Sequence, residues 1–164
     1  MRYFEKISFD EFSKAISNDK DLYDGYCLPE RATKYSCGYD FYAIEDIILH
    51  PGEIKKIPTG YKAKFMSDEV LMLVVRSSMG FKYNIRMCNQ VGIIDSDYYN
   101  NLTNEGRIWV ALQNEGNMDY VIKKGTAFCQ GIFMKYLTCG DVVDDERISG
   151  IGSTDKKDES EIDG

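Results

Sequence analysis

Residues 89–98 read Asn89-Gln90-Val91-Gly92-Ile93-Ile94-Asp95-Ser96-Asp97-Tyr98, a short apolar run that ends at two closely spaced carboxylates. Such a run is typical of a strand that leads into a turn. A carboxylate at the end of an apolar strand can act as a general base. Asp-Ser-Asp is also common turn material, and these residues taken alone favour a hairpin turn.

Short apolar or alternating runs surround this stretch from Leu28 onward. The expected strands are 39–43, 46–49, 54–57, 61–65, 70–75, 91–94, 107–113, 119–122 and 128–135. Turn signals separate them at Pro51-Gly52, Thr59-Gly60, Asn100-Asn101, 114–116 and Lys124-Gly125. Strands this close together predict an all-β fold, an antiparallel sandwich or barrel.

Composition and charge narrow the class of protein. The 164 residues are enough for one domain with a sizeable core, and 12 Tyr and 8 Phe favour strands. A net charge of −7 repels nucleic acid, so we expect no nucleic-acid partner. The five cysteines form no C-x-x-C pair and the single histidine is His50, which argues against a structural zinc site and a disulfide framework.

Both ends of the chain differ from this β texture. Residues 7–18 carry a helix signature, in which Ser8 and Glu11 match a capping box and apolar residues recur at helical spacing. We expect this helix to pack on its own domain rather than on a partner. The polar, charge-dense tail after about residue 140 is expected to be mobile. No run has the length of a signal-peptide core or a membrane span, so we expect no membrane association and a cytoplasmic location.

Two further segments carry groups suited to phosphate. In 74–78 an apolar strand runs into Arg76, Ser77 and Ser78, a fork of donors followed by the start of a helical turn. In 149–154 alternating glycines could form an anion-binding nest with neighbouring hydroxyls. The alternatives are an ordinary helix cap with a surface arginine for the first segment and a flexible linker for the second.

Taken together and in order, these segments resemble the five motifs of the trimeric dUTP pyrophosphatase (dUTPase) family. The matching segments, in motif order, are 37–43, 76–80, 89–98, 125–130 and 147–154. The third is the most specific, and the resemblance covers about residues 28–154.

The resemblance implies a jelly-roll-like β barrel or sandwich with a short N-terminal helix and a flexible C-terminal arm. It divides the chain into a helical extension at 1–27, a β core at 28–140 and a mobile arm at 141–164. It also implies a homotrimer whose active sites are shared between subunits. The implied activity is hydrolysis of dUTP to dUMP and pyrophosphate, which keeps uracil out of DNA and supplies dUMP for dTMP synthesis.

Site residues follow from the resemblance position by position. Asp95 resembles the carboxylate that activates the attacking water, and Ile93 and Ile94 are expected to keep it desolvated. Family members use Mg²⁺ chelated by the triphosphate and held through water near the first-motif carboxylate, here Asp40. The implied substrate-binding residues are Arg76, Ser77, Ser78, Asn89, Ile93, Ile94, Tyr98, Trp109, Gln130, Arg147, Gly150, Ile151, Gly152, Ser153 and Thr154.

The sequence departs from the family pattern at several positions. Ile151 replaces the phenylalanine that stacks on uracil, so a flat contact surface is lost. Ala127 replaces an arginine in the fourth motif, and 100–105 is an insertion after the third. Two other functions fit the scaffold: a regulatory module that acts by binding a protein partner, and dCTP deamination. Ala111 stands where a deaminase carries its catalytic glutamate, which disfavours the latter.

Overall fold

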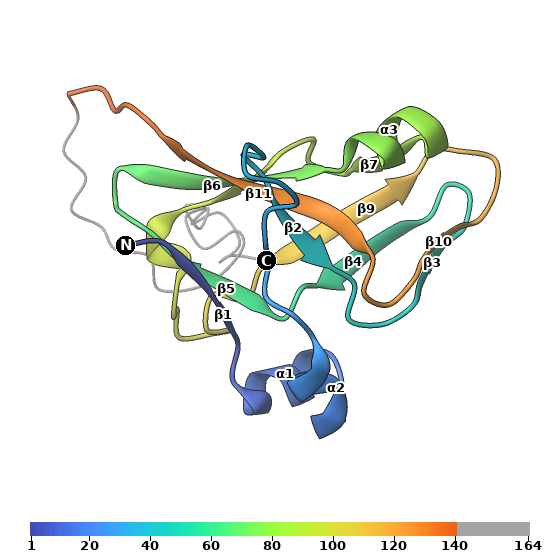
Figure 1. Cartoon of the computed structure of the whole chain (residues 1–164), viewed down its shortest axis with the longest axis horizontal. Coiled ribbons are helices and arrows are strands. Elements are labelled where there is room, and N and C mark those ends of the chain that lie inside the picture. Colours follow the sequence, from blue (N-terminus) through green and yellow to red (C-terminus); the bar gives the residue numbers. More distant parts are fainter. Residues whose placement is uncertain (141–164) are drawn as a thin grey trace, which may run out of the picture.

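The computed structural model describes residues 1–140 (Figure 1). In this part of the chain the helices are α1 Phe9–Ala15, α2 Lys20–Gly25 and α3 Ser77–Tyr83, with the short 3-10 helix η1 at Ser96–Tyr98. The strands are β1 Tyr3–Lys6, β2 Tyr39–Tyr42, β3 Ile47–Leu49, β4 Ile54–Pro58, β5 Tyr61–Lys64, β6 Glu69–Val75, β7 Ile85–Met87, β8 Gly92–Ile94, β9 Trp109–Asn114, β10 Tyr120–Ile122 and β11 Ala127–Lys135.

The strands form four antiparallel sheets within residues 1–140, so the predicted all-β class is confirmed and the arrangement is sandwich-like rather than a closed barrel. The main sheet has the order β2-β11-β6-β8 and the second sheet the order β4-β9-β7. Strand β1 pairs with β5, and β10 pairs with β3. The nine-residue β11 pairs with β2 on one side and with β6 on the other, so it holds these two strands in one sheet.

Alternation along the strands separates a core face from an outer face in the main sheet. Leu71 and Leu73 of β6 are fully buried, whereas Met72 between them is half-buried. Each residue of β6 faces the same side as its partner on β11, and the register pairs Met72 with Ile132 and Val74 with Gln130. The outer face of the main sheet therefore carries Met72, Val74, Gln130, Ile132 and Met134.

The N-terminal helix packs on its own domain, as expected. Ser8 caps α1 by accepting a hydrogen bond from the Glu11 amide, and Phe12 is fully buried with its ring stacked on Tyr26 at 5.5 Å between centroids. The helix is shorter than the predicted 7–18, since it ends at Ala15 and a second helix, α2, capped by Asp19, follows at Lys20–Gly25. Figure 1 shows α1 and α2 side by side at one end of the molecule, beyond β1 and β5.

Two strands escaped prediction. β1 exists through its pairing with β5, nearly sixty positions away, a contact that local pattern does not reveal. β7 follows directly after α3, where the left-handed Asn84 (φ 56°) ends the helix. No helix in the described residues is both long and apolar enough to cross a membrane.

Candidate functional site

Three strands of the main sheet bring the predicted phosphate-side residues together. The register of β11 places Gln130 opposite Asp40 on β2 and opposite Val74 on β6. Two residues beyond Val74, Arg76 ends the strand and caps α3, and its Nε lies 3.5 Å from Asp40 Oδ1. Ser77 and Ser78 form the first turn of α3 and are exposed. These residues, named here the phosphate half, present donors and one carboxylate on a single surface.

Gly38 leaves room for the side chain of Gln130. A Cβ added to Gly38 would lie 2.3 Å from Gln130 Oε1, so the amide occupies space that any other residue would fill. The segment around Glu30 is held beside β2 by Asp40, whose backbone amide donates to the Glu30 carbonyl at 2.7 Å. Glycine in the first motif therefore has a packing role toward the fourth.

Asp95 lies at the other end of the main sheet. It follows β8 and precedes η1, with extended backbone (φ −82°, ψ 157°), and its side chain is exposed. Ile93 is 56% exposed because alternation turns it to the outer face, while Ile94 is half-buried. Within one chain Asp95 and Ile93 are therefore both exposed on the outer face.

The remaining third-motif residues lie before and after Asp95 in the chain. Asn89 is exposed in the turn after β7, where the Val91 amide donates to the Asn89 carbonyl at 2.6 Å and Gln90 is left-handed (φ 64°). Tyr98 ends η1 and is buried to 6% exposure. Its hydroxyl donates to the Arg107 carbonyl at 3.0 Å, and this bond restricts the orientation of the ring.

The register of β8 on β6 separates these two groups of residues. Ile94 pairs with Leu71, and one further step places Asp95 beside Val70. Val70 and Arg76 lie six positions apart on the same strand, which corresponds to about 20 Å. Asp95 and the phosphate half therefore cannot act on the same phosphate group within one chain.

Trp109, another predicted substrate-binding residue, begins β9. It pairs with Pro58 of β4, and the guanidinium of Arg107 lies over its ring at 4.6 Å from the centroid. Arg107 itself was not predicted, and a buried cation next to the third motif leaves no mark in the sequence pattern. The predicted fifth-motif residues Arg147, Gly150, Ile151, Gly152, Ser153 and Thr154 lie outside the described residues.

A comparison with protein families decides the identity of the fold. The dUTPase family model matches residues 26–157. The chain belongs to the dUTPase family. Deoxyuridine 5'-triphosphate nucleotidohydrolase of Lactococcus lactis is 44% identical over 133 residues, which cover 79% of this chain and 89% of that protein. The protein of the same name from Hahella chejuensis is 38% identical over 149 residues, with coverage of 85% and 93%.

Solved dUTPase structures have the same fold. The crystal structure of dUTPase from Streptococcus mutans has a TM-score of 0.69 and 36% identity, and covers 84% of this chain and 98% of that one. The dUTPase from phage phi11 of S. aureus, at 19% identity and a TM-score of 0.65, shares the fold. The resemblance drawn from the five motifs is confirmed at the level of the family.

Proposed function

We propose that this dUTPase-family chain hydrolyses dUTP to dUMP and pyrophosphate, with Asp95 as the general base and with active sites shared between subunits. The observation that carries the proposal is the distance between Asp95 and the phosphate half. Asp95 lies beside Val70 at the start of β6, and Arg76 follows the end of β6, about 20 Å away. Two copies of the chain supply both groups to one substrate.

The chemistry of the base follows from its position. A carboxylate at the end of β8 accepts a proton from a water molecule that then attacks the α-phosphorus in line. A neighbouring subunit that covers Ile93 would also remove Asp95 from bulk water. Pyrophosphate leaves with additional negative charge, which Arg76 neutralises through its fork of donors. Ser77, Ser78 and Gln130 supply further donors to the phosphate oxygens.

Selection of the nucleotide falls to the third motif. The backbone of the turn around Asn89 offers a fixed set of donors and acceptors for the uracil edge, and cytosine presents the opposite set. The ring of Tyr98 is proposed to lie under the deoxyribose and to leave no space for a 2′-hydroxyl. Its burial and its bond to the Arg107 carbonyl give the ring the rigidity that such exclusion requires.

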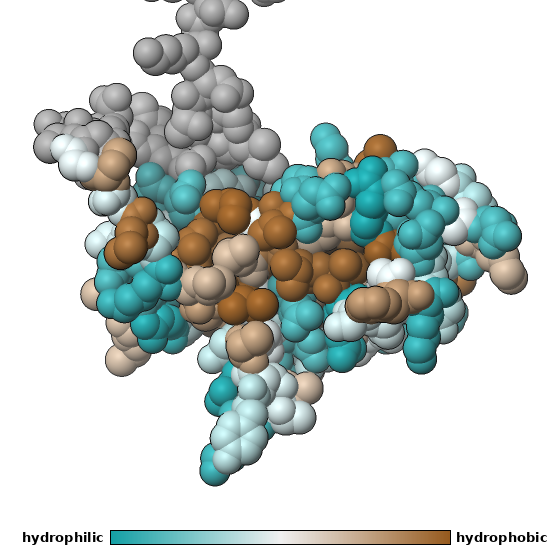
Figure 2. Space-filling view, turned by 90° about the horizontal axis from the view of Figure 1, so that it is seen from above, coloured by the Kyte–Doolittle hydropathy of each residue, from teal (hydrophilic) through white to brown (hydrophobic). Residues whose placement is uncertain are grey.

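The outer face of the main sheet supports the homotrimer. Between the phosphate half and Asp95 it is apolar, with Ile93 56% exposed and Met134 48% exposed beside half-buried Met72 and Ile132. Figure 2 shows apolar side chains gathered on the face seen from above Figure 1, where β6 and β11 lie. An apolar patch of this kind typically marks a protein interface. A subunit seated on it would bring its own Asp95 toward the phosphate half of its neighbour.

The donor set fits Mg²⁺ bound mainly by substrate. Within residues 1–140 no group of three metal-ligating side chains occurs. Asp40 is a single carboxylate, buried to 8% exposure and close to Arg76, which suits a water-mediated contact with an ion that keeps most of its hydration shell. When bound with the triphosphate, Mg²⁺ would neutralise phosphate charge and orient the chain of phosphates.

Two measurements test this function. Release of pyrophosphate and of ammonia is followed with dUTP, dCTP, UTP and dTTP, with and without Mg²⁺, and we expect pyrophosphate from dUTP only. Ammonia from dCTP would indicate a deaminase instead. Asp95→Asn is expected to lower turnover by about 10²–10⁴-fold, while a non-hydrolysable dUTP analogue still binds. Asp97→Asn is the matched control and retains turnover; wild-type turnover in Asp95→Asn refutes the role of the base.

A further inference from the structure

The hydroxyl of Tyr98 is bonded to the loop that follows η1. Its hydroxyl donates to the Arg107 carbonyl and accepts from Asn104 Nδ2, both at 3.0 Å. Residues 99–107, named here the insertion loop, thus leave Tyr98 along the chain and return to its hydroxyl at Arg107. The position of the ring depends on where this loop is anchored.

Arg107 anchors the end of the insertion loop to helix α1. Its Nη1 donates to Glu11 Oε1 at 2.6 Å, and the two side chains are only 11% and 12% exposed. The same guanidinium stacks on Trp109. The carbonyl that receives the Tyr98 hydroxyl therefore belongs to a residue whose side chain is tied to the N-terminal segment.

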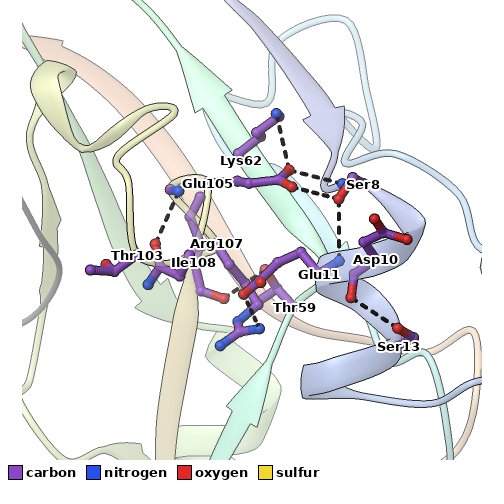
Figure 3. Close-up of polar contacts among 12 residues, drawn as sticks. Ser8, Asp10, Glu11, Ser13, Thr59, Lys62, Thr103, Glu105, Arg107 and Ile108 are labelled. Carbon is purple, nitrogen blue, oxygen red and sulfur yellow. Dashed lines mark hydrogen bonds and ion pairs between the residues drawn. The ribbon is translucent and has the colours of Figure 1, made fainter.

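Glu105 forms a second anchor to the same helix. Its carboxylate accepts hydrogen bonds from the Ser8 amide at 2.9 Å and from the Ser8 hydroxyl, and Lys62 Nζ lies 3.4 Å away (Figure 3). Partial burial opposes ionisation, yet the bonds from Ser8 and the charge of Lys62 hold the pKa of Glu105 below its ordinary value. The carboxylate is thus charged at neutral pH and holds the first residue of the α1 cap.

The insertion loop transmits these anchors because it is internally bonded. Asn101 Oδ1 accepts from the amides of Thr103 and Asn104 at 3.0 and 3.2 Å, and Asn101 Nδ2 donates to the Tyr98 carbonyl at 2.9 Å. The Asn100 amide also donates to the Glu105 carbonyl at 3.0 Å. A shift at Glu105 therefore moves the chain that holds both the backbone and the hydroxyl of Tyr98.

Stability alone does not account for the pair of Glu11 and Arg107. A buried ion pair contributes little net stability compared with apolar side chains of similar size, and its best-supported use is to fix one arrangement. Here Arg107 Nε is buried without a hydrogen-bond partner in the described part of the chain, which adds a further cost. What the pair does provide is a defined position for the Arg107 carbonyl.

We propose that α1 is a positioning element for sugar selection, in which Glu11 and Ser8 hold the insertion loop through Arg107 and Glu105 and thereby hold the ring of Tyr98. The inference rests on the proposed function, since it takes Tyr98 to be the residue that excludes a 2′-hydroxyl. None of these four side chains is required to touch the nucleotide; they act through Tyr98. Helix α1 and the insertion loop would therefore act together to position the ring of Tyr98.

The test compares dUTP with UTP in full-length variants. Glu11→Gln and Glu105→Gln keep the shape of each side chain and remove its charge. We expect the ratio of kcat/KM for UTP to kcat/KM for dUTP to rise about tenfold in each, because a displaced Tyr98 ring leaves space for the 2′-hydroxyl and UTP then binds more tightly. The change is expected mainly in KM. Amide hydrogen exchange over 98–107 is expected to quicken in both variants.

Asp19→Ala is the matched control, because it removes the cap of α2 and leaves the contacts of Ser8 and Glu11 of α1 with the insertion loop in place. It is expected to lower Tm and leave the selectivity ratio unchanged. Ser8→Gly, which keeps a cap-compatible residue and the backbone donor to Glu105, gives the same test if a glutamine variant does not fold. Wild-type dUTP turnover with an unchanged ratio in the variants overturns this inference alone, whereas a wild type that does not hydrolyse dUTP overturns the proposed function as well.

Discussion

Mixed trimers offer a direct test of whether one active site draws on two chains. Asp95→Asn removes the base, and Arg76→Ala removes the main cation of the phosphate half. The two changes lie about 20 Å apart on one chain, at opposite ends of β6. In a trimer that contains both variants, Asp95 of one subunit can still meet Arg76 of the next.

The expected recovery follows from cyclic symmetry. In the proposed trimer each site would take Asp95 from one subunit and Arg76 from its neighbour, always in the same rotational sense. In any trimer that contains both variants, one of the sites joins an intact Asp95 to an intact Arg76, so activity returns to about one third of wild type. Trimers of Asp95→Asn alone are expected to retain roughly 1% or less. Recovery therefore exceeds the background by at least an order of magnitude.

The assay uses co-expression of the two variants with different affinity tags. Tandem purification isolates only mixed trimers, light scattering verifies their mass, and pyrophosphate release from dUTP gives the activity per trimer. An untagged mixture of separately purified homotrimers is the control and should stay at background. Mixed trimers that are no more active than the mean of the two homotrimers would refute the shared site.

Two further outcomes follow from packing. Gly38→Ala places a Cβ against Gln130 Oε1 and should raise KM for dUTP about tenfold, which corresponds to the loss of one charge-assisted hydrogen bond, while Tm stays close to wild type. Gly25→Ala is the control, because a Cβ there would meet nothing within 4 Å, and it should leave KM unchanged; equal KM values in both variants contradict the role of Gly38. Phe12→Ala should lower the free energy of unfolding by about 3–5 kcal/mol in urea titrations, because Phe12 is fully buried, whereas Phe81→Ala at 93% exposure should change it little; similar losses in both would show that α1 is not part of the core.

Alternation and turn chemistry predicted most of the fold. The strands that carry the phosphate half, β2, β6 and β11, all lie within a residue or two of their expected bounds. These strands have apolar patterns of their own, and turn residues punctuate them. The five motifs in order predicted the family, whereas Asp95 considered by itself resembled turn material.

Long-range partners account for what the sequence did not reveal. β1 forms only against β5, and its own residues, Tyr3–Lys6, mix polar and apolar side chains without a clear period. Within one chain Ile93 and Asp95 are both exposed, because side-chain alternation places Ile93 on the outer face. The bond between Arg107 and Glu11 joins residues that are 96 positions apart.

The apolar outer face of β6 and β11 has a consequence for how the chain behaves at low concentration. If the trimer covers Ile93 and Met134, the folded subunit gains stability only by mass action with its copies. Specific activity should then fall on dilution, and a newly synthesised subunit would expose this apolar surface until it assembles with other copies. Expression level, and not only sequence, would set how much of this protein is active in a cell.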